Sequence, residues 1–531
     1  MTNKTLIIGL DGVTFDLIKP WVEQGKLPTF KLLLEQGAHG ILKSSIPPAS
    51  CTAWPSFYTG TNPGKFGVYN FENFKPNSYD TYFVNYHSIK EKTLWDIFGE
   101  NEKKSAIMNV PVTYPVREMK GIMISGTAIS PEYAVFPKEF KSELPSDYLF
   151  NIPPVHSSGR DKYIETNFKS MEQQYNLINK FLEQDYDLIF SVFRTTDFFC
   201  HRFLKSMVDQ DEKYKNTLYD AYKKVDDYLA ELIKVKNTNL IIMSDHGNTF
   251  LKKTFFINDW LIQQGYLTIK KYHKSLLKKI GINQDNVYHF LTKLKLAWIT
   301  KLLSKKIKEK VPKKLAQSID LNNVDWSKTK AIAKFPSGIN INSKSKRPQG
   351  IVSDEEYDNL ITELKTKLKN VQDNGEKLNI EVFDNTVYSG NYKNLAPDLV
   401  LLIEGGSYRT ASSIGNEEIL MGNVSPNSTS NHTMDGIFIA FGPDIKQIKI
   451  DDADITDVAP TILHLNNITP PENMDGKVLT QIFNKEFEST EKTEQSTSQL
   501  NSTEKEPEEE YYNQEEEDIV KERLKSLGYL D

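Results

Sequence analysis

The sequence predicts an α/β protein, a three-layer sandwich with a mostly parallel central sheet and an inserted helical or α+β cap region. Three observations predict this fold. Short continuous apolar runs recur along the chain, helical stretches lie between them, and several runs end at side chains able to do chemistry. Continuous apolar runs are typical of strands buried on both faces, as in parallel sheets. Their alternation with helices indicates an α/β sandwich.

The predicted elements follow one another along the chain. The strands are expected at Thr5–Leu10, Ala106–Val110, Ile122–Ser125, Asp187–Phe193, Asn239–Met243, Leu399–Ile403 and Gly436–Phe441. Helical stretches such as Leu27–Glu35 and Tyr163–Gln184 lie between them. Ligands of such sheets bind beyond the carboxyl ends of the strands, so Asp11 and the Asp245–His246 pair are expected at one edge.

The pattern divides the chain into a core and additions. We predict a core of residues 1–251 and 398–484, an inserted cap region of residues 252–397, an acidic disordered linker of residues 485–514, and a C-terminal docking helix of residues 515–531. Within the cap region, residues 260–316 are predicted to be helical. Ala331–Asn342, Ile351–Val371 and Leu378–Val387 then suggest a small strand–helix–strand unit.

Composition excludes several classes of protein. The chain has 531 residues, of which 39% are hydrophobic, and no run approaches the roughly 18 apolar residues of a membrane span. Two cysteines exclude a disulfide framework and a four-cysteine metal site. The short apolar run before Asp11 does not fit a signal peptide, so we expect a cytoplasmic location.

A net charge of -6 hides strong segregation of charge. The segment Lys252–Lys314 holds 16 lysines and no arginine against three acidic residues. A solvated helical surface explains it, and so does attraction of anionic substrates or lipid headgroups. Nucleic-acid binding is disfavoured, because the segment offers no arginine fork for base edges and its aromatic residues look like helix-packing residues.

Acidic and imidazole side chains form a pattern suited to metal ions. Asp197 and His201 are spaced i, i+4, which puts them on one face of a helix. With Asp11, Asp245, His246 and His432 the candidates are three carboxylates and three imidazoles. Mixed nitrogen and oxygen ligands suit Zn²⁺, with Mn²⁺ as an alternative. Six ligands are too many for one tetrahedral ion but suit two, and paired cations are a known clamp for displacement at phosphorus.

These motifs together resemble the alkaline phosphatase superfamily, in particular the bacterial and archaeal members of its type I phosphodiesterase/nucleotide pyrophosphatase branch. The resemblance covers roughly residues 4–484 and adds the closing stretch Leu524–Leu530. It rests on Asp11 and on the segments Pro48–Gly60, Asp197–His201, Ser244–Gly247, Ser430–Gly436, Asp457–Leu463 and Met474–Leu479.

The resemblance implies a ligand set and a nucleophile. One metal would be held by Asp197, His201 and His432, and the second by Asp11, Asp245 and His246. Ser50 falls at the nucleophile position, where it would also coordinate the second metal, and Thr52 is the alternative. The implied reaction is cleavage of phosphodiester or pyrophosphate bonds in a small phosphoester or nucleotide-like substrate, through a phosphoseryl intermediate.

Other activities stay open at this point. A phosphomonoesterase or a phosphomutase would use the same metal core, and a non-catalytic protein could use the basic insertion to bind anionic surfaces. The sequence also departs from the family pattern. Phe71 stands where nucleotide pyrophosphatases carry an asparagine that binds a phosphate oxygen, with Asn70 beside it. Cys51 lacks the Pro and Arg context of a sulfatase cysteine and is interpreted as a small buried thiol.

Overall fold

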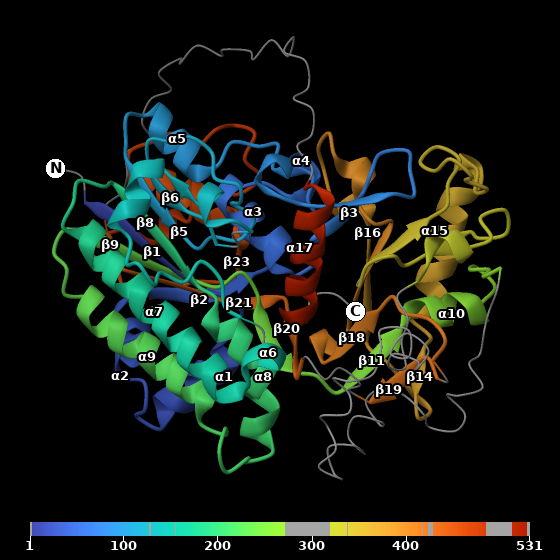
Figure 1. Cartoon of the computed structure of the whole chain (residues 1–531), viewed down its shortest axis with the longest axis horizontal. Helices are drawn as coiled ribbons and strands as arrows, with labels where there is room; N and C mark the ends of the chain where they lie inside the picture. Colours follow the sequence, from blue (N-terminus) through green and yellow to red (C-terminus); the bar gives the residue numbers. More distant parts are fainter. Residues whose placement is uncertain are drawn as a thin grey trace.

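The computed structural model describes residues 3–126, 129–153, 155–270, 319–336, 338–416, 418–422, 428–484 and 512–527. It shows a three-layer α/β core with a smaller α/β unit beside it (Figure 1). Most of the lysine-rich segment and almost all of the predicted acidic linker fall in 271–318 and 485–511, outside the described residues.

A ten-stranded sheet forms the centre of the core, in the order β22-β2-β21-β9-β1-β8-β5-β6-β7, with β23 paired to β2. The strands are β1 (Lys4–Leu10), β2 (Ala38–Lys43), β5 (Ser105–Met108), β6 (Gly121–Ile124), β7 (Val135–Phe136), β8 (Leu188–Phe193), β9 (Thr238–Met243), β21 (Asp435–Phe441), β22 (Ile448–Lys449) and β23 (Ala453–Asp454). The middle strands β6, β5, β8, β1 and β9 run parallel, whereas β21 runs antiparallel to β9. The mostly parallel sheet predicted from the apolar runs is therefore confirmed.

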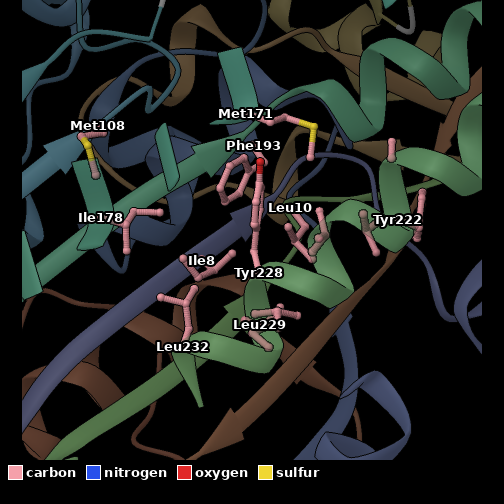
Figure 2. Close-up of a cluster of buried hydrophobic side chains, with 14 of the residues drawn as sticks. Ile8, Leu10, Met108, Met171, Ile178, Phe193, Tyr222, Tyr228, Leu229 and Leu232 are labelled. Carbon is pink, nitrogen blue, oxygen red and sulfur yellow. The ribbon is translucent and has the colours of Figure 1, made fainter. Parts of the chain in front are cut away.

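Helices cover both faces of this sheet, because its strands are apolar on both sides. Along β1, Leu6, Ile8 and Leu10 enter one hydrophobic cluster and Ile7 enters another on the opposite face. The first face carries α1 (Phe15–Glu23), α2 (Pro28–Gln36), α7 (Arg160–Leu182), α8 (Thr195–Val208) and α9 (Thr217–Leu232), and the second carries α3 (Ser50–Thr59), α5 (Leu94–Glu100) and α16 (Val458–Leu465). Figure 2 shows Ile8 and Leu10 of β1 among side chains of α7 and α9.

Shorter elements connect these layers. They are α4 (Pro63–Phe66), β3 (Glu72–Phe74), β4 (Thr81–Phe83), α6 (Val155–Ser158), β10 (Gly247–Phe250) and β20 (Ser430–Thr433). The pair of β10 and β20 is antiparallel and joins the chain just after His246 to the chain around His432.

A second sheet, in the order β12-β13-β17-β18-β11-β19 with β16 paired to β17, forms the smaller unit. Its strands are β11 (Lys253–Phe256), β12 (Ala331–Ile332), β13 (Gly338–Ile341), β16 (Ile380–Asp384), β17 (Leu399–Ile403), β18 (Tyr408–Ala411) and β19 (Leu420–Gly422), accompanied by the hairpin β14 (Gln372–Asp373) and β15 (Glu376–Lys377). The helices α10 (Ile257–Gln263) and α15 (Asp354–Leu368) pack on this sheet. In α15, the i, i+4, i+8 stripe of Leu360, Leu364 and Leu368 is buried.

One predicted strand lies in a different sheet from the one expected. Leu399–Ile403 was expected in the core, and the inserted region was expected to end at residue 397. The run instead forms β17, which pairs along its whole length with β16 of the smaller unit. Its side chains Leu399, Leu401 and Ile403 pack in the cluster that contains the α15 leucines. The smaller unit therefore runs from β11 to β19.

The described C-terminal segment forms α17 (Gln514–Leu527), which Figure 1 draws in red between the core and the smaller unit. It contacts the core, because Leu524 is buried and the ring of Tyr512, just before the helix, stacks on Tyr114 at a centroid distance of 6.4 Å. Within the described ranges, every helix is too short or too polar to serve as a membrane span.

Candidate active site

Three adjacent parallel strands deliver acidic side chains to one edge of the core sheet. Asp11 directly follows β1, Asp197 lies in the first turn of α8 after β8, and Asp245 and His246 come shortly after the end of β9. Since β8, β1 and β9 are neighbours in register, their carboxyl ends meet at the same place. All of these side chains are buried.

Ser50 and the remaining histidines approach the same place from other elements. Ser50 is the first residue of α3, and its Oγ lies 3.3 Å from Asp11 Oδ1 and 3.2 Å from His246 Nε2. His201 is one helical turn after Asp197, and His432 is carried by β20 opposite Asn248 of β10. The structure thus brings together all seven residues that the sequence singles out. The Thr52 hydroxyl, the alternative nucleophile, lies 3.7 Å from Cys51 Sγ.

The seven side chains form two adjoining groups. In the first, Asp197 Oδ1 lies 3.3 Å from His201 Nε2 and 3.7 Å from His432 Nε2, and the two Nε2 atoms are 3.1 Å apart. In the second, His246 Nε2 lies 3.3 Å from Asp245 Oδ2 and 3.7 Å from Asp11 Oδ1. The rings of His246 and His432 stack with their centroids 3.7 Å apart. Ligand atoms of Asp197, His246 and His432 also lie within 4.8 Å of one another. We group His201, rather than His246, with Asp197 and His432, because the three distances between the ligand atoms of Asp197, His201 and His432 are all below 4 Å.

The hydrogen bonds of the three imidazoles fix their tautomers. The Nδ1–H of His246 donates to the Gly247 carbonyl at 3.1 Å, and that of His432 donates to the Pro48 carbonyl at 3.0 Å. The hydroxyl of Ser428 donates to the Ser430 carbonyl, so at 2.7 Å it accepts from Nδ1–H of His201. Each Nε2 therefore carries a lone pair facing the carboxylates, which is the usual arrangement of a metal-ligating histidine.

The electrostatics of the site fit bound cations. Burial, with the charges of Asp245 and Asp197, raises the pKa of Asp11 well above its usual range, and burial also raises the pKa of Asp245. Burial and the neighbouring His246 hold the pKa of His432 well below its usual range, so this ring is neutral. Asp245 Oδ2 is buried without a hydrogen-bond donor. Buried carboxylates facing imidazole lone pairs are a donor set that fits divalent cations.

Sequence reasoning missed the residues that position these ligands. The side-chain amide of Asn248 donates to Asp197 Oδ1 at 3.0 Å and to the Gly12 carbonyl at 2.9 Å, and Trp54 Nε1 donates to Asp11 Oδ2 at 3.4 Å. Asn248 lies in β10 opposite His432, and this pairing of two distant segments cannot be recognised from the sequence. Gly12 has a φ of +67°, and a Cβ there would overlap the Asn248 amide.

A pocket opens beside the first group of ligands. We call it the active-site pocket; it is lined by Pro47, Pro48, Ala49, Tyr69, Asn70, Phe71, His201, Pro336, Leu401, Leu402, Ile403, Tyr408, Arg409, Thr410, Ser428, Ser430, Asn431 and His432. Strands β17 and β18 of the smaller unit therefore form one wall. Asn70 and Phe71 both line it, and Asn70 Oδ1 accepts the Phe71 backbone N–H at 2.8 Å, which leaves the Asn70 amide group as a donor.

Comparison with known proteins identifies the class. The model of the type I phosphodiesterase / nucleotide pyrophosphatase family matches residues 5–435, so the chain belongs to this family. It is a hydrolase of phosphoester or phosphoanhydride bonds, in a family that depends on metal ions. No curated protein matches the chain.

The chain is similar to several solved structures at low sequence identity. Human ectonucleotide pyrophosphatase / phosphodiesterase 5 is 14% identical with a TM-score of 0.50, over 91% of this chain and 100% of that chain. The murine protein of the same name is 15% identical with a TM-score of 0.46, over 88% of this chain and 96% of that chain. A murine structure of an inactive variant in complex with AMP has the same values. The alkaline phosphatase-like fold expected from the sequence is confirmed.

Proposed function

We propose that the chain cleaves phosphodiester or pyrophosphate bonds with Ser50 as the nucleophile and two divalent cations as cofactors. The observation that carries the proposal is the position of Ser50 Oγ, between a carboxylate oxygen of Asp11 and Nε2 of His246. Asp11, Asp245 and His246 would hold the cation beside Ser50, and Asp197, His201 and His432 would hold the other. The mixed donor set favours Zn²⁺, and Mn²⁺ is the alternative.

The residues of the chain prepare Ser50 for attack. Its Oγ lies 3.3 Å from Asp11 Oδ1 and 3.2 Å from His246 Nε2, two of the atoms that would hold the adjacent cation, so Ser50 Oγ would lie beside that cation. Ser50 opens α3, where the positive end of the helix dipole favours an oxyanion. When bound, the cations supply positive charge that stabilises the serine alkoxide and the phosphoryl oxygens. The serine oxygen attacks phosphorus while one P–O bond of the ester or anhydride breaks, so an alcohol or a phosphate leaves and its oxygen takes up a proton. Water then attacks the same phosphorus and releases the phosphoryl group from Ser50.

Asn70 is our candidate for the donor to a phosphoryl oxygen. The family asparagine is replaced by Phe71, whose side chain has no donor. Asn70 lines the same pocket, and its Oδ1 is already held by the backbone of Phe71, so the amide nitrogen is available to donate.

The active-site pocket favours a substrate that carries an organic ester group. Leu402 lies on the face of β17 opposite the residues packed with α15. Because Ile403 pairs with Tyr408, Leu402 is beside Arg409, which also lines the pocket. An apolar wall next to the metal ligands suits an ester substituent better than a bare phosphate. Nucleotides are candidate substrates, since the matching family model is named for nucleotide pyrophosphatases.

The test compares a diester with a monoester on the purified full chain. We expect bis(p-nitrophenyl) phosphate to be hydrolysed much faster than p-nitrophenyl phosphate, and only with added Zn²⁺ or Mn²⁺. Faster turnover of the monoester would contradict the diesterase proposal and would indicate a phosphomonoesterase or a phosphomutase. Turnover that survives removal of all divalent metal would contradict the metal-dependent mechanism.

A further inference from the structure

A second pocket also borders Phe71, and the C-terminal helix α17 forms part of it. We call it the C-terminal pocket, and its lining includes Phe71, Tyr114, Arg194, Tyr512 and Arg523. Phe71 lines both pockets. Arg194 directly precedes α8, the helix that carries Asp197 and His201. The C-terminal pocket therefore borders the active-site pocket at Phe71 and lies next to the start of the helix that carries Asp197 and His201.

The walls of this pocket combine aromatic surface with positive charge. The rings of Tyr114 and Tyr512 stack at an interplanar angle of 23°, and Phe198, Val520 and Leu524 add apolar surface. Arg194 and Arg523 are the charged residues of the lining, and among the described residues that form it none is acidic. Burial lowers the pKa of Arg523, although a guanidinium stays charged at neutral pH.

The face of α17 that meets the core explains why Arg523 is in the pocket. Val520, Arg523 and Leu524 are spaced i, i+3, i+4 and so share one face of the helix. Leu524 is buried and holds this face against the core, whereas Lys521 and Glu522 are exposed. The helix thus turns Arg523 toward the pocket and Lys521 toward solvent.

We propose that the C-terminal pocket is a second substrate subsite, which binds an anionic group attached to an aromatic or apolar body. The proposal rests on the proposed hydrolase function and extends it to the part of the substrate remote from the scissile bond. A guanidinium group has five N–H donors, so Arg194 and Arg523 can each bind a phosphate or a carboxylate through charge-assisted hydrogen bonds in addition to the contacts they make within the protein. The aromatic rings offer stacking surface to a planar group.

The test uses two nucleotide substrates that differ in charge beyond the scissile phosphate. ATP carries further anionic phosphates, and the p-nitrophenyl ester of thymidine 5′-monophosphate carries none. With saturating divalent metal, we expect Arg523→Gln to raise KM for ATP about tenfold. The variant should leave kcat for ATP, and both constants for the ester, within about twofold. Arg523→Lys should restore part of the loss because it restores the charge.

The control is Lys521→Gln, which removes an exposed cation from the same helix and should change neither substrate. An unchanged KM for ATP in Arg523→Gln would overturn the proposal. An equal rise in KM for ATP and for the ester would also overturn it, because a merely structural role of Arg523 would affect both substrates alike. An effect of Lys521→Gln as large as that of Arg523→Gln would overturn it as well.

A binding measurement separates this proposal from the proposed function. If the wild-type chain hydrolyses neither of these substrates nor bis(p-nitrophenyl) phosphate, the proposed function fails, and calorimetry with ADP and metal then tests the pocket alone. Weaker ADP binding in Arg523→Gln, by about tenfold against Lys521→Gln, would support the pocket without the reaction. Equal binding by the two variants would overturn it.

Discussion

At the scale of single residues, the account depends on which hydroxyl attacks phosphorus. Ser50→Ala should lower kcat with bis(p-nitrophenyl) phosphate by at least about 10³-fold, because no other oxygen replaces the nucleophile. Metal content, measured by elemental analysis, should stay near two ions per chain. Thr52→Ala is the matched control and should keep most of the activity, since its hydroxyl lies near Cys51 Sγ. Activity retained by Ser50→Ala and lost in Thr52→Ala would reverse the assignment.

Ser428 gives a second test at this scale, because it holds His201 in the tautomer that can bind a metal. The Ser430 hydroxyl lies 3.1 Å from the same His201 Nδ1, so the variant with both Ser428→Ala and Ser430→Ala should weaken binding of one of the two ions by about 10- to 100-fold. Titration of the metal-free protein with Zn²⁺ measures this. Ser413→Ala, which removes a buried hydroxyl without a hydrogen-bond partner, is the control. Equal Zn²⁺ affinity in the double variant and the control would show that these two serines do not position a ligand.

The sequence identifies the candidate metal ligands but not the residues that position them. Asp197 and His201 are recognisable from their spacing, and Asp11 from its place after an apolar run. The partners of the imidazoles are the backbone carbonyls of Pro48 and Gly247 and the hydroxyls of Ser428 and Ser430, and Ser428 lies 227 positions from His201. Such contacts depend on how loops meet in space, and serine and carbonyl groups are too common for a pattern to single them out.

At the scale of elements, the strand β17 shows what the pattern of apolar residues does not predict. An apolar run predicts a buried strand, and Leu399–Ile403 is one. The run does not say which sheet the strand joins, because that depends on pairing with β16 and on packing against α15. The consequence is functional, since β17 forms a wall of the active-site pocket instead of extending the core sheet.

An ion pair ties α15 to β16 beneath this wall. Lys365 Nζ lies 2.6 Å from Asp384 Oδ2, and hydrogen bonds from Lys365 and Thr386 lower the pKa of Asp384 to about 2. We expect Asp384→Asn to lower the free energy of unfolding at pH 7 by about 1 kcal/mol, after allowance for partial exposure. Urea denaturation followed by circular dichroism measures it.

The pH dependence of this effect has a definite sign. A carboxyl whose pKa is lowered by folding stabilises the fold above its unfolded pKa of about 4, and this contribution is lost as the pH falls toward 2. The difference between Asp384→Asn and wild type should therefore shrink across that window. The exposed Asp358, also on α15, provides the control Asp358→Asn, which should change little. A difference that persists at pH 2, or an equal effect of the control, would contradict the assignment.

At the scale of the whole molecule, the site is built from parts far apart in the chain. The segments that follow the core strands β1, β8 and β9 supply Asp11, Asp197, His201, Asp245 and His246, and β20 supplies His432. The smaller unit and α17 each form a wall of one of the two pockets that meet at Phe71. We infer that the core sets the reaction and that these additions set the substrate. The anionic-surface contact expected of Lys252–Lys314 stays a prediction, because most of that segment lies outside the described residues.

The central claim is that two cations occupy this one edge of the sheet. Anomalous X-ray diffraction above the zinc absorption edge, from crystals grown with Zn²⁺, tests it most directly. The account predicts two peaks about 3.5–4 Å apart, one among Asp197, His201 and His432 and the other among Asp11, Asp245 and His246 with Ser50 beside it. A single peak, or peaks away from these side chains, would contradict it.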